Sequence, residues 1–136
     1  MEPAVGDIFR ITLFPEDGVH PKNPGDRNRT KYVVVLGIDD ESIMVGSVLI
    51  NSKINDSLFA RIGPYQHCIY SSDYSFMTKD ESYIDCFRIK EISASRLCST
   101  GIYVGKLCER DIEAASELAA SSPANKPAIL QKYHLV

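Results

Sequence analysis

The chain has 136 residues, of which 44% are hydrophobic and 24% are charged, and its formal net charge at pH 7 is −3. This length and composition fit one small folded domain with an ordinary hydrophobic core. The acidic balance excludes general attraction of polyanions by overall charge, so a nucleic-acid site would need a local cluster of cations.

The four cysteines and the N-terminal segment limit the chemistry further. No two cysteines lie closer than ten residues, which excludes a CxxC metal or redox motif. Residues 1–7 contain no cationic stretch followed by an apolar run, and no later run approaches about 18 apolar residues. We therefore expect a cytoplasmic location without membrane contact, no metal or other cofactor, and reduced cysteines that pack as small buried hydrophobes.

Five strands are predicted where short apolar or alternating runs are bounded by Gly, Pro, Asn and Asp. Both alternating faces of the third run are apolar, which is typical of a strand covered on both sides, as in a compact barrel. The short Asp39-Asp40-Glu41 segment indicates a hairpin before that run. The predicted strands are Asp7–Phe14, Tyr32–Ile38, Ser42–Ile50, Gln66–Ser71 and Tyr83–Ile92.

An amphipathic helix is predicted from Glu109, because apolar residues recur at spacings of three and four between Ile112 and Ala119. Pro123 should end this helix near Ser121.

The fold expected from these elements is one mainly β domain over residues 1–122, a barrel with a C-terminal helix. Residues 123–136 form a tail that contains two prolines and several apolar side chains. The sequence leaves open whether this tail docks as a short helix or is flexible.

Cations gather in the long segment between the first two strands. Lys22, Arg27, Arg29 and Lys31 fall within ten residues, which makes this segment a candidate phosphate-binding patch. Where the second strand begins, Arg29 and Lys31 would share a face, because side chains two apart in an extended chain point the same way. The alternative is a solvated loop without a ligand.

His67 is the histidine best placed for chemistry, since it lies on a predicted strand beside the expected groove. Its neighbour Cys68 would face the opposite way, so the two cannot form a nucleophile and base pair. The alternative for His67 is a structural role within the strand.

The order of several segments resembles that of the MazF/PemK/Kid toxins over about Val5 to Ala120. No single segment is specific, whereas the order of all of them is characteristic. The segments are Gly6-Asp7-Ile8-Phe9, the basic entry to Val33–Leu36, Leu49–Lys53, Tyr65–Ile69, Ser82–Ile92 with a turn at Ser95-Arg96-Leu97, and Gly105-Lys106-Leu107 before the helix.

This resemblance implies an SH3-like barrel of the CcdB/MazF type, usually a homodimer, that cleaves single-stranded mRNA without a metal and is blocked by an antitoxin. Family catalysis uses an arginine just before a proline at the second strand and a threonine ending the third. Lys31-Tyr32 and Asn51 stand at those positions here. Because lysine lacks the bidentate guanidinium fork, we expect Arg29 to supply it.

The site residues expected from the cation spacing, the strand position of His67 and the resemblance fall into two groups. Arg29, Lys31, Asn51 and Ser52 are the expected catalytic residues. Lys22, Arg27, Lys53 and His67 are the expected RNA contacts.

Three functions are compatible with the sequence. The favoured one is a metal-independent endoribonuclease of a type II toxin–antitoxin system. The second is a MazF-like module that binds RNA or an antitoxin but does not cleave. The third is a CcdB-like growth inhibitor that binds gyrase through its terminal helix.

Overall fold

The computed structural model describes residues 2–19, 28–54 and 56–136. The strands are β1 (Asp7–Leu13), β2 (Arg29–Ile38), β3 (Met44–Asn51), β4 (Gln66–Tyr70), β5 (Glu81–Ser93) and β6 (Ile102–Lys106). The helices are α1 (Phe59–Ile62), α2 (Ala94–Thr100), α3 (Glu109–Ser121) and α4 (Pro127–Lys132), and short 3-10 turns lie at Pro15–Asp17, Asp56–Leu58 and Gly63–Tyr65. The prediction of a mainly β fold with a C-terminal helix is confirmed.

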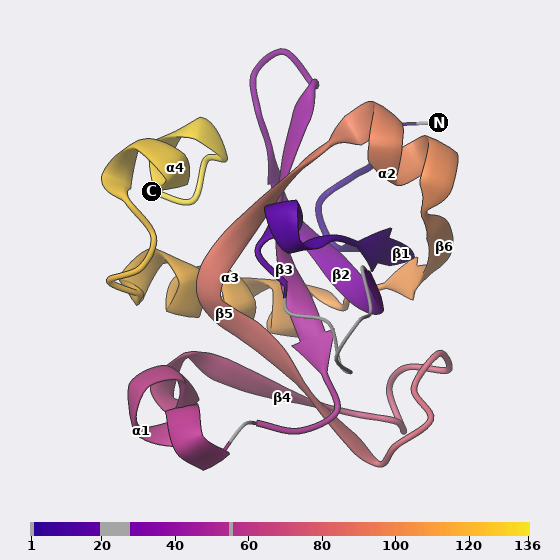
Figure 1. Ribbon diagram of the computed structural model, residues 1–136, viewed down its shortest axis with the longest axis vertical. Coiled ribbons are helices and arrows are strands. Elements are labelled where there is room, and N and C mark those ends of the chain that lie inside the picture. Colours follow the sequence, from indigo (N-terminus) through magenta and orange to yellow (C-terminus); the bar gives the residue numbers. More distant parts are fainter. Residues whose placement is uncertain (1, 20–27, 55) are drawn as a thin grey trace.

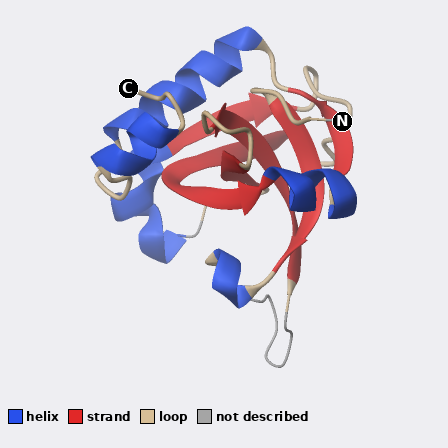
Figure 2. Cartoon of the chain, turned by 90° about the horizontal axis from the view of Figure 1, so that it is seen from above, coloured by secondary structure: helices blue, strands red, loops and turns tan. Residues whose placement is uncertain are grey.

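The six strands form one antiparallel sheet in the order β4-β5-β3-β2-β1-β6 (Figure 1). The sheet curls into a half-barrel whose edges are β4 and β6, and helices lie on more than one side of it (Figure 2). Within the described part of the chain, each helix is too short or too polar to cross a bilayer.

Two hydrophobic clusters lie on opposite faces of the sheet, as the apolar runs of β2 and β3 predict. On β2, Val33 and Val35 face one cluster, and Val34 and Leu36 face the other. On β3, Val45 joins the first cluster and Val48 the second. The second cluster is covered by α3 and α4, and the first is covered in part by α2.

Three local predictions need correction. Strand β2 begins at Arg29 rather than at Tyr32, so both strand-entry cations lie within the sheet. Residues 95–97 are part of helix α2 rather than a turn, because the Ser93 hydroxyl caps the helix by accepting from the Arg96 amide. Strand β6 was not predicted, since its short run carries the exposed apolar side chains of Ile102 and Tyr103.

The tail docks on the sheet, which decides the alternative that the sequence left open. Tyr133 is 1% exposed, and its hydroxyl donates to Glu91 Oε1 at 2.7 Å. Its ring lies over Gly46, and its backbone carbonyl and Cβ lie over Gly37, which pairs with Gly46 across β2 and β3. A Cβ added at Gly46 would lie 2.7 Å from the Tyr133 ring, so the missing side chains of these glycines make the room that the tail occupies.

A buried carboxylate fastens the first turn of α3 to β4 and to the segment before β5. Asp111 is 3% exposed and accepts hydrogen bonds from His67 Nε2 at 2.8 Å, from the Tyr74 hydroxyl at 2.5 Å and from Cys108 Sγ at 3.2 Å. Arg110 Nε lies 3.5 Å from the same carboxylate. Burial alone would raise the pKa of Asp111, but these partners outweigh it and lower the pKa to about 2.

The cysteines differ in their surroundings. Cys86 is fully buried, as predicted. Cys108 is exposed, so the expectation of a buried hydrophobe is wrong for it. Its backbone forms the N-cap of α3, and its amide donates to the Tyr74 hydroxyl at 3.0 Å.

Substitution of Gly46 by alanine should lower the free energy of unfolding by about 1–3 kcal/mol, because the added methyl group displaces the Tyr133 ring. Gly105→Ala is the matched control, since a Cβ at this strand glycine meets nothing within 4 Å. Urea denaturation of the three proteins measures the effect. Equal stabilities of the two variants would contradict the docking contact.

The Asp111 network should make stability pH-dependent in a defined direction. Because the folded pKa is about 2 and the ordinary value is 3.8, the stabilisation is complete above about pH 5 and is lost as the pH falls through 3.8 towards 2. Relative to wild type, Asp111→Asn should lose roughly 2 kcal/mol above pH 5 and progressively less below pH 4. The exposed Asp73 provides the control variant Asp73→Asn, which should follow wild type across the same denaturation series.

Candidate functional site

Lys31 and Asn51 lie side by side on neighbouring strands, although 20 residues separate them in sequence. The register of β2 and β3 pairs Tyr32 with Ile50, which sets Lys31 opposite Asn51 on the same face of the sheet. There Lys31 Nζ donates a hydrogen bond to Asn51 Oδ1. The structure thus brings together the two residues at the catalytic positions implied by the resemblance.

Lys31 is half-buried, and its surroundings disfavour the charged form of its amine. Burial and the nearby positive charge of Arg29 lower the pKa of Lys31 to about 8, although the Asp85 carboxylate acts in the opposite direction. A lysine with this pKa changes its protonation state close to neutral pH. Arg29, two residues earlier on β2, is exposed.

Two further polar side chains continue the same face across the sheet. Asn51 pairs with Tyr83 on β5, and two residues along that strand Asp85 pairs with Gln66 on β4. Gln66 Nε2 donates to Asp85 Oδ1 at 2.8 Å. We call Lys31, Asn51, Asp85 and Gln66 the polar cluster, which crosses four adjacent strands from β2 to β4.

The other predicted catalytic and RNA-contacting residues are not part of the polar cluster. Ser52 and Lys53 follow the end of β3 directly and are exposed. Lys22 and Arg27 lie outside the described residues.

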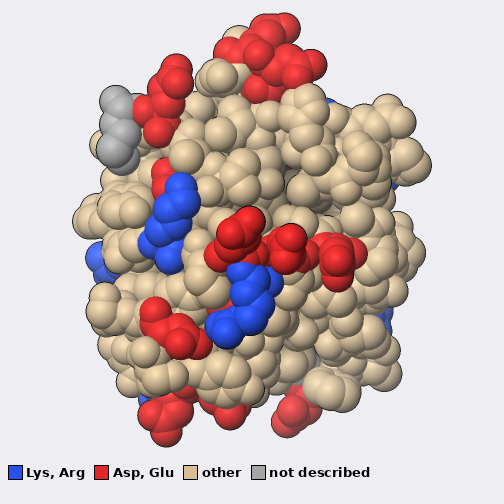
Figure 3. All heavy atoms as spheres, turned by 180° about the vertical axis from the view of Figure 1, so that it is seen from behind, with Lys and Arg blue, Asp and Glu red and all other residues tan. Residues whose placement is uncertain are grey.

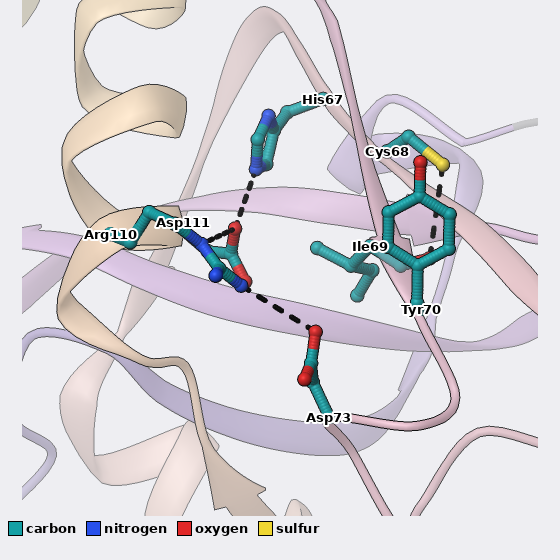
Figure 4. A pocket seen from close by; sticks show the side chains of 7 residues that line it. All are labelled: His67, Cys68, Ile69, Tyr70, Asp73, Arg110 and Asp111. Carbon is teal, nitrogen blue, oxygen red and sulfur yellow. Dashed lines mark hydrogen bonds and ion pairs between the residues drawn. The ribbon is translucent and has the colours of Figure 1, made fainter.

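His67 lies on the opposite face of the sheet from the polar cluster, because its neighbour Gln66 faces Asp85. It borders a pocket of about 430 Å³ between β4, the loop after it and the start of α3 (Figure 4). The pocket is lined by His67, Cys68, Ile69, Tyr70, Asp73, Arg110 and Asp111. The structure therefore does not bring His67 together with Lys31 and Asn51.

The charged groups of this pocket satisfy one another. His67 bonds to Asp111, and Arg110 bridges Asp111 and Asp73, each at 3.5 Å. A group that is already paired in this way gives less to a ligand than an unpaired one. The face of the molecule in Figure 3 likewise shows Lys and Arg side chains close to Asp and Glu, with no continuous basic patch.

Sequence reasoning did not identify Gln66 and Asp85 as members of the site. Each lies on a strand that was predicted, Gln66 at the start of one and Asp85 within another. Assigning them to the site requires knowing that β3 and β4 pair with opposite edges of β5. A single sequence does not define strand partners.

Comparisons with known proteins do not identify a family for this chain. No family model matches its sequence, and no curated protein is significantly similar to it. Function is therefore inferred from the polar cluster itself.

Proposed function

We propose that the protein is a metal-independent endoribonuclease that cleaves single-stranded RNA at the polar cluster. The observation that carries this proposal is the hydrogen bond between Lys31 and Asn51. It joins a cation and an amide on the same face of the sheet, with Arg29 two residues away along β2.

The scissile phosphate would bind between Lys31 and Arg29, whose charges offset the charge that develops on its oxygens. Because Asn51 Oδ1 accepts from Lys31, the amide nitrogen of Asn51 remains as a donor for a non-bridging oxygen. Attack of the adjacent 2′-hydroxyl, whose proton passes to water, would leave a 2′,3′-cyclic phosphate. The Lys31 ammonium would protonate the departing 5′-oxygen.

The homodimer and the antitoxin implied by the resemblance belong to the same proposal. Strand β6 offers a surface for a protein partner, since it is an edge of the sheet and its Ile102 and Tyr103 side chains are 59% and 48% exposed.

Cleavage of an unstructured RNA in the presence of EDTA should depend on the polar cluster. Lys31→Ala should lower the rate about 10²-fold or more, because the phosphate loses a neighbouring cation and the leaving group loses its proton donor. Asn51→Ala should cost about 10²-fold through loss of one transition-state donor. Lys126→Ala removes an exposed lysine at the start of α4 and should cleave like wild type. Gel analysis of end-labelled RNA gives the rates.

RNA that is retained without being cut, by a folded wild-type protein, would contradict the enzyme and favour the binding module. Unchanged cleavage by Lys31→Ala would contradict the assignment of the site.

Binding of RNA should weaken at alkaline pH because the phosphate prefers the ammonium form of Lys31. The pKa of Lys31 in the free protein is about 8 and a bound phosphate raises it, so affinity is complete below pH 8 and falls as the pH rises above it. Fluorescence anisotropy with an uncleavable 2′-O-methyl oligonucleotide between pH 6 and 9.5 measures this decline.

Two variants test the cause of that decline. Lys31→Arg should remove it, since guanidinium stays charged throughout this range. Arg29→Ala should move it to higher pH, because the charge of Arg29 is one cause of the lowered pKa of Lys31. A decline that is identical in all three proteins would show that another group titrates.

A further inference from the structure

Gln66 and Asp85 of the polar cluster each keep one oxygen that accepts no hydrogen bond from the described residues. Asp85 Oδ1 accepts from Gln66 Nε2 at 2.8 Å and from the Phe87 amide at 3.1 Å. An ionised carboxylate only accepts, so the amino group of Gln66 must face Asp85, and its carbonyl oxygen Oε1 is directed elsewhere. Among the described residues, neither Gln66 Oε1 nor Asp85 Oδ2 receives a hydrogen bond. Two acceptors thus remain on adjacent side chains.

These acceptors lie close to the proposed phosphate site. Asp85 on β5 and Lys31 on β2 are separated by β3 alone, which corresponds to about 10 Å across two strand spacings. Their charges interact, since the Asp85 carboxylate favours the charged form of Lys31. A base bound at Asp85 would therefore belong to a nucleotide beside the phosphate that Lys31 contacts.

Aromatic rings flank Asp85 along β5. Tyr83, two residues before it, shares the face of Asn51 and is half-buried. Phe87, two residues after it, packs on Tyr65 with ring centroids 5.7 Å apart, and Arg61 lies 5.2 Å from the centre of the Phe87 ring. Single-stranded RNA is recognised by such a combination, in which bases stack on aromatic side chains and polar groups contact their Watson–Crick edges.

Among the RNA bases, guanine matches two adjacent acceptors. Its Watson–Crick edge carries two neighbouring donors, N1–H and the N2 amino group. Adenine, cytosine and uracil each place an acceptor beside their donor, and that acceptor would face a carboxylate or carbonyl oxygen. Such a mismatch is unfavourable because the bound base would shield these protein acceptors from water without giving them a donor.

We propose that Asp85 and Gln66 form a guanine-recognition site next to the phosphate-binding residues. Asp85 Oδ2 accepts from guanine N1–H, Gln66 Oε1 accepts from the N2 amino group, and the ring of Tyr83 or Phe87 stacks on the base. This inference rests on the proposed function, since it names the base that the same site selects.

Equilibrium binding with base analogues tests this site without any change to the protein. The probes are uncleavable 2′-O-methyl oligouridines with one central guanosine, inosine or adenosine, compared by fluorescence anisotropy at fixed salt. Guanosine should bind about tenfold or more tightly than adenosine. Inosine keeps N1–H but lacks the N2 amino group, so its affinity should fall between the two.

The variant Asp85→Asn should reduce the ratio of guanosine to adenosine affinity to near one while the oligonucleotide still binds, because the amide introduces a donor in place of an acceptor. Asp73→Asn changes the same charge at an exposed position beside the pocket and should keep the wild-type ratio. The ratio is compared because both substitutions also change the general attraction of a polyanion.

The outcomes separate this proposal from the proposed function. Equal affinity of the wild-type protein for the three probes would overturn the guanine site and leave the ribonuclease proposal standing. Guanine selection without cleavage of the matching RNA would overturn the ribonuclease and support the guanine site. Absence of binding to any probe would overturn both.

Discussion

The pairing of β5 with two partners is the constraint on which the other features depend. This 13-residue strand pairs with β3 over most of its length and with β4 over its first half. The register shifts between Ser47 and Leu49, where an irregularity interrupts the ladder. Irregularities of this kind increase local twist and bend a strand, and here they accompany the curl of the sheet. The same pairings set Asp85 opposite Gln66 and place Asn51 opposite Tyr83, two residues from Asp85 along β5 and on the same face.

The two faces of the sheet carry different sets of polar side chains. On one face, His67 and Asp111 tie α3 to β4 with hydrogen bonds that satisfy buried polar groups. On the other face, Lys31 and Asn51 are half-buried and are joined by a hydrogen bond. Side-chain alternation along β4 places Gln66 on the face of the polar cluster and His67 on the opposite face, since neighbouring residues point to opposite faces. Stability and the proposed chemistry are therefore supported by different residues.

A lysine in this site differs physically from the arginine that the resemblance implies. Guanidinium stays charged at any physiological pH, whereas the amine of Lys31 has a pKa of about 8 in its half-buried position. In the proposed site, lysine would replace bidentate phosphate contact by a group that can release a proton near neutrality. Arg29, exposed on the same strand, leaves a guanidinium available close by.

Local patterns in the sequence determined most of the strands, helix α3 and the hairpin at Asp39-Asp40-Glu41, because alternation, helical spacing and turn residues are properties of neighbours in the chain. The proximity of Arg29 and Lys31 followed from their spacing of two.

Only the tertiary structure decided which strands pair, and with that the hydrogen bond of Lys31 to Asn51 and the contact of Gln66 with Asp85. It also decided that His67 faces α3 and that Tyr133 docks over Gly37 and Gly46. These contacts join residues far apart in sequence. Their free energy depends on register and on complementary shape, and a local pattern contains neither.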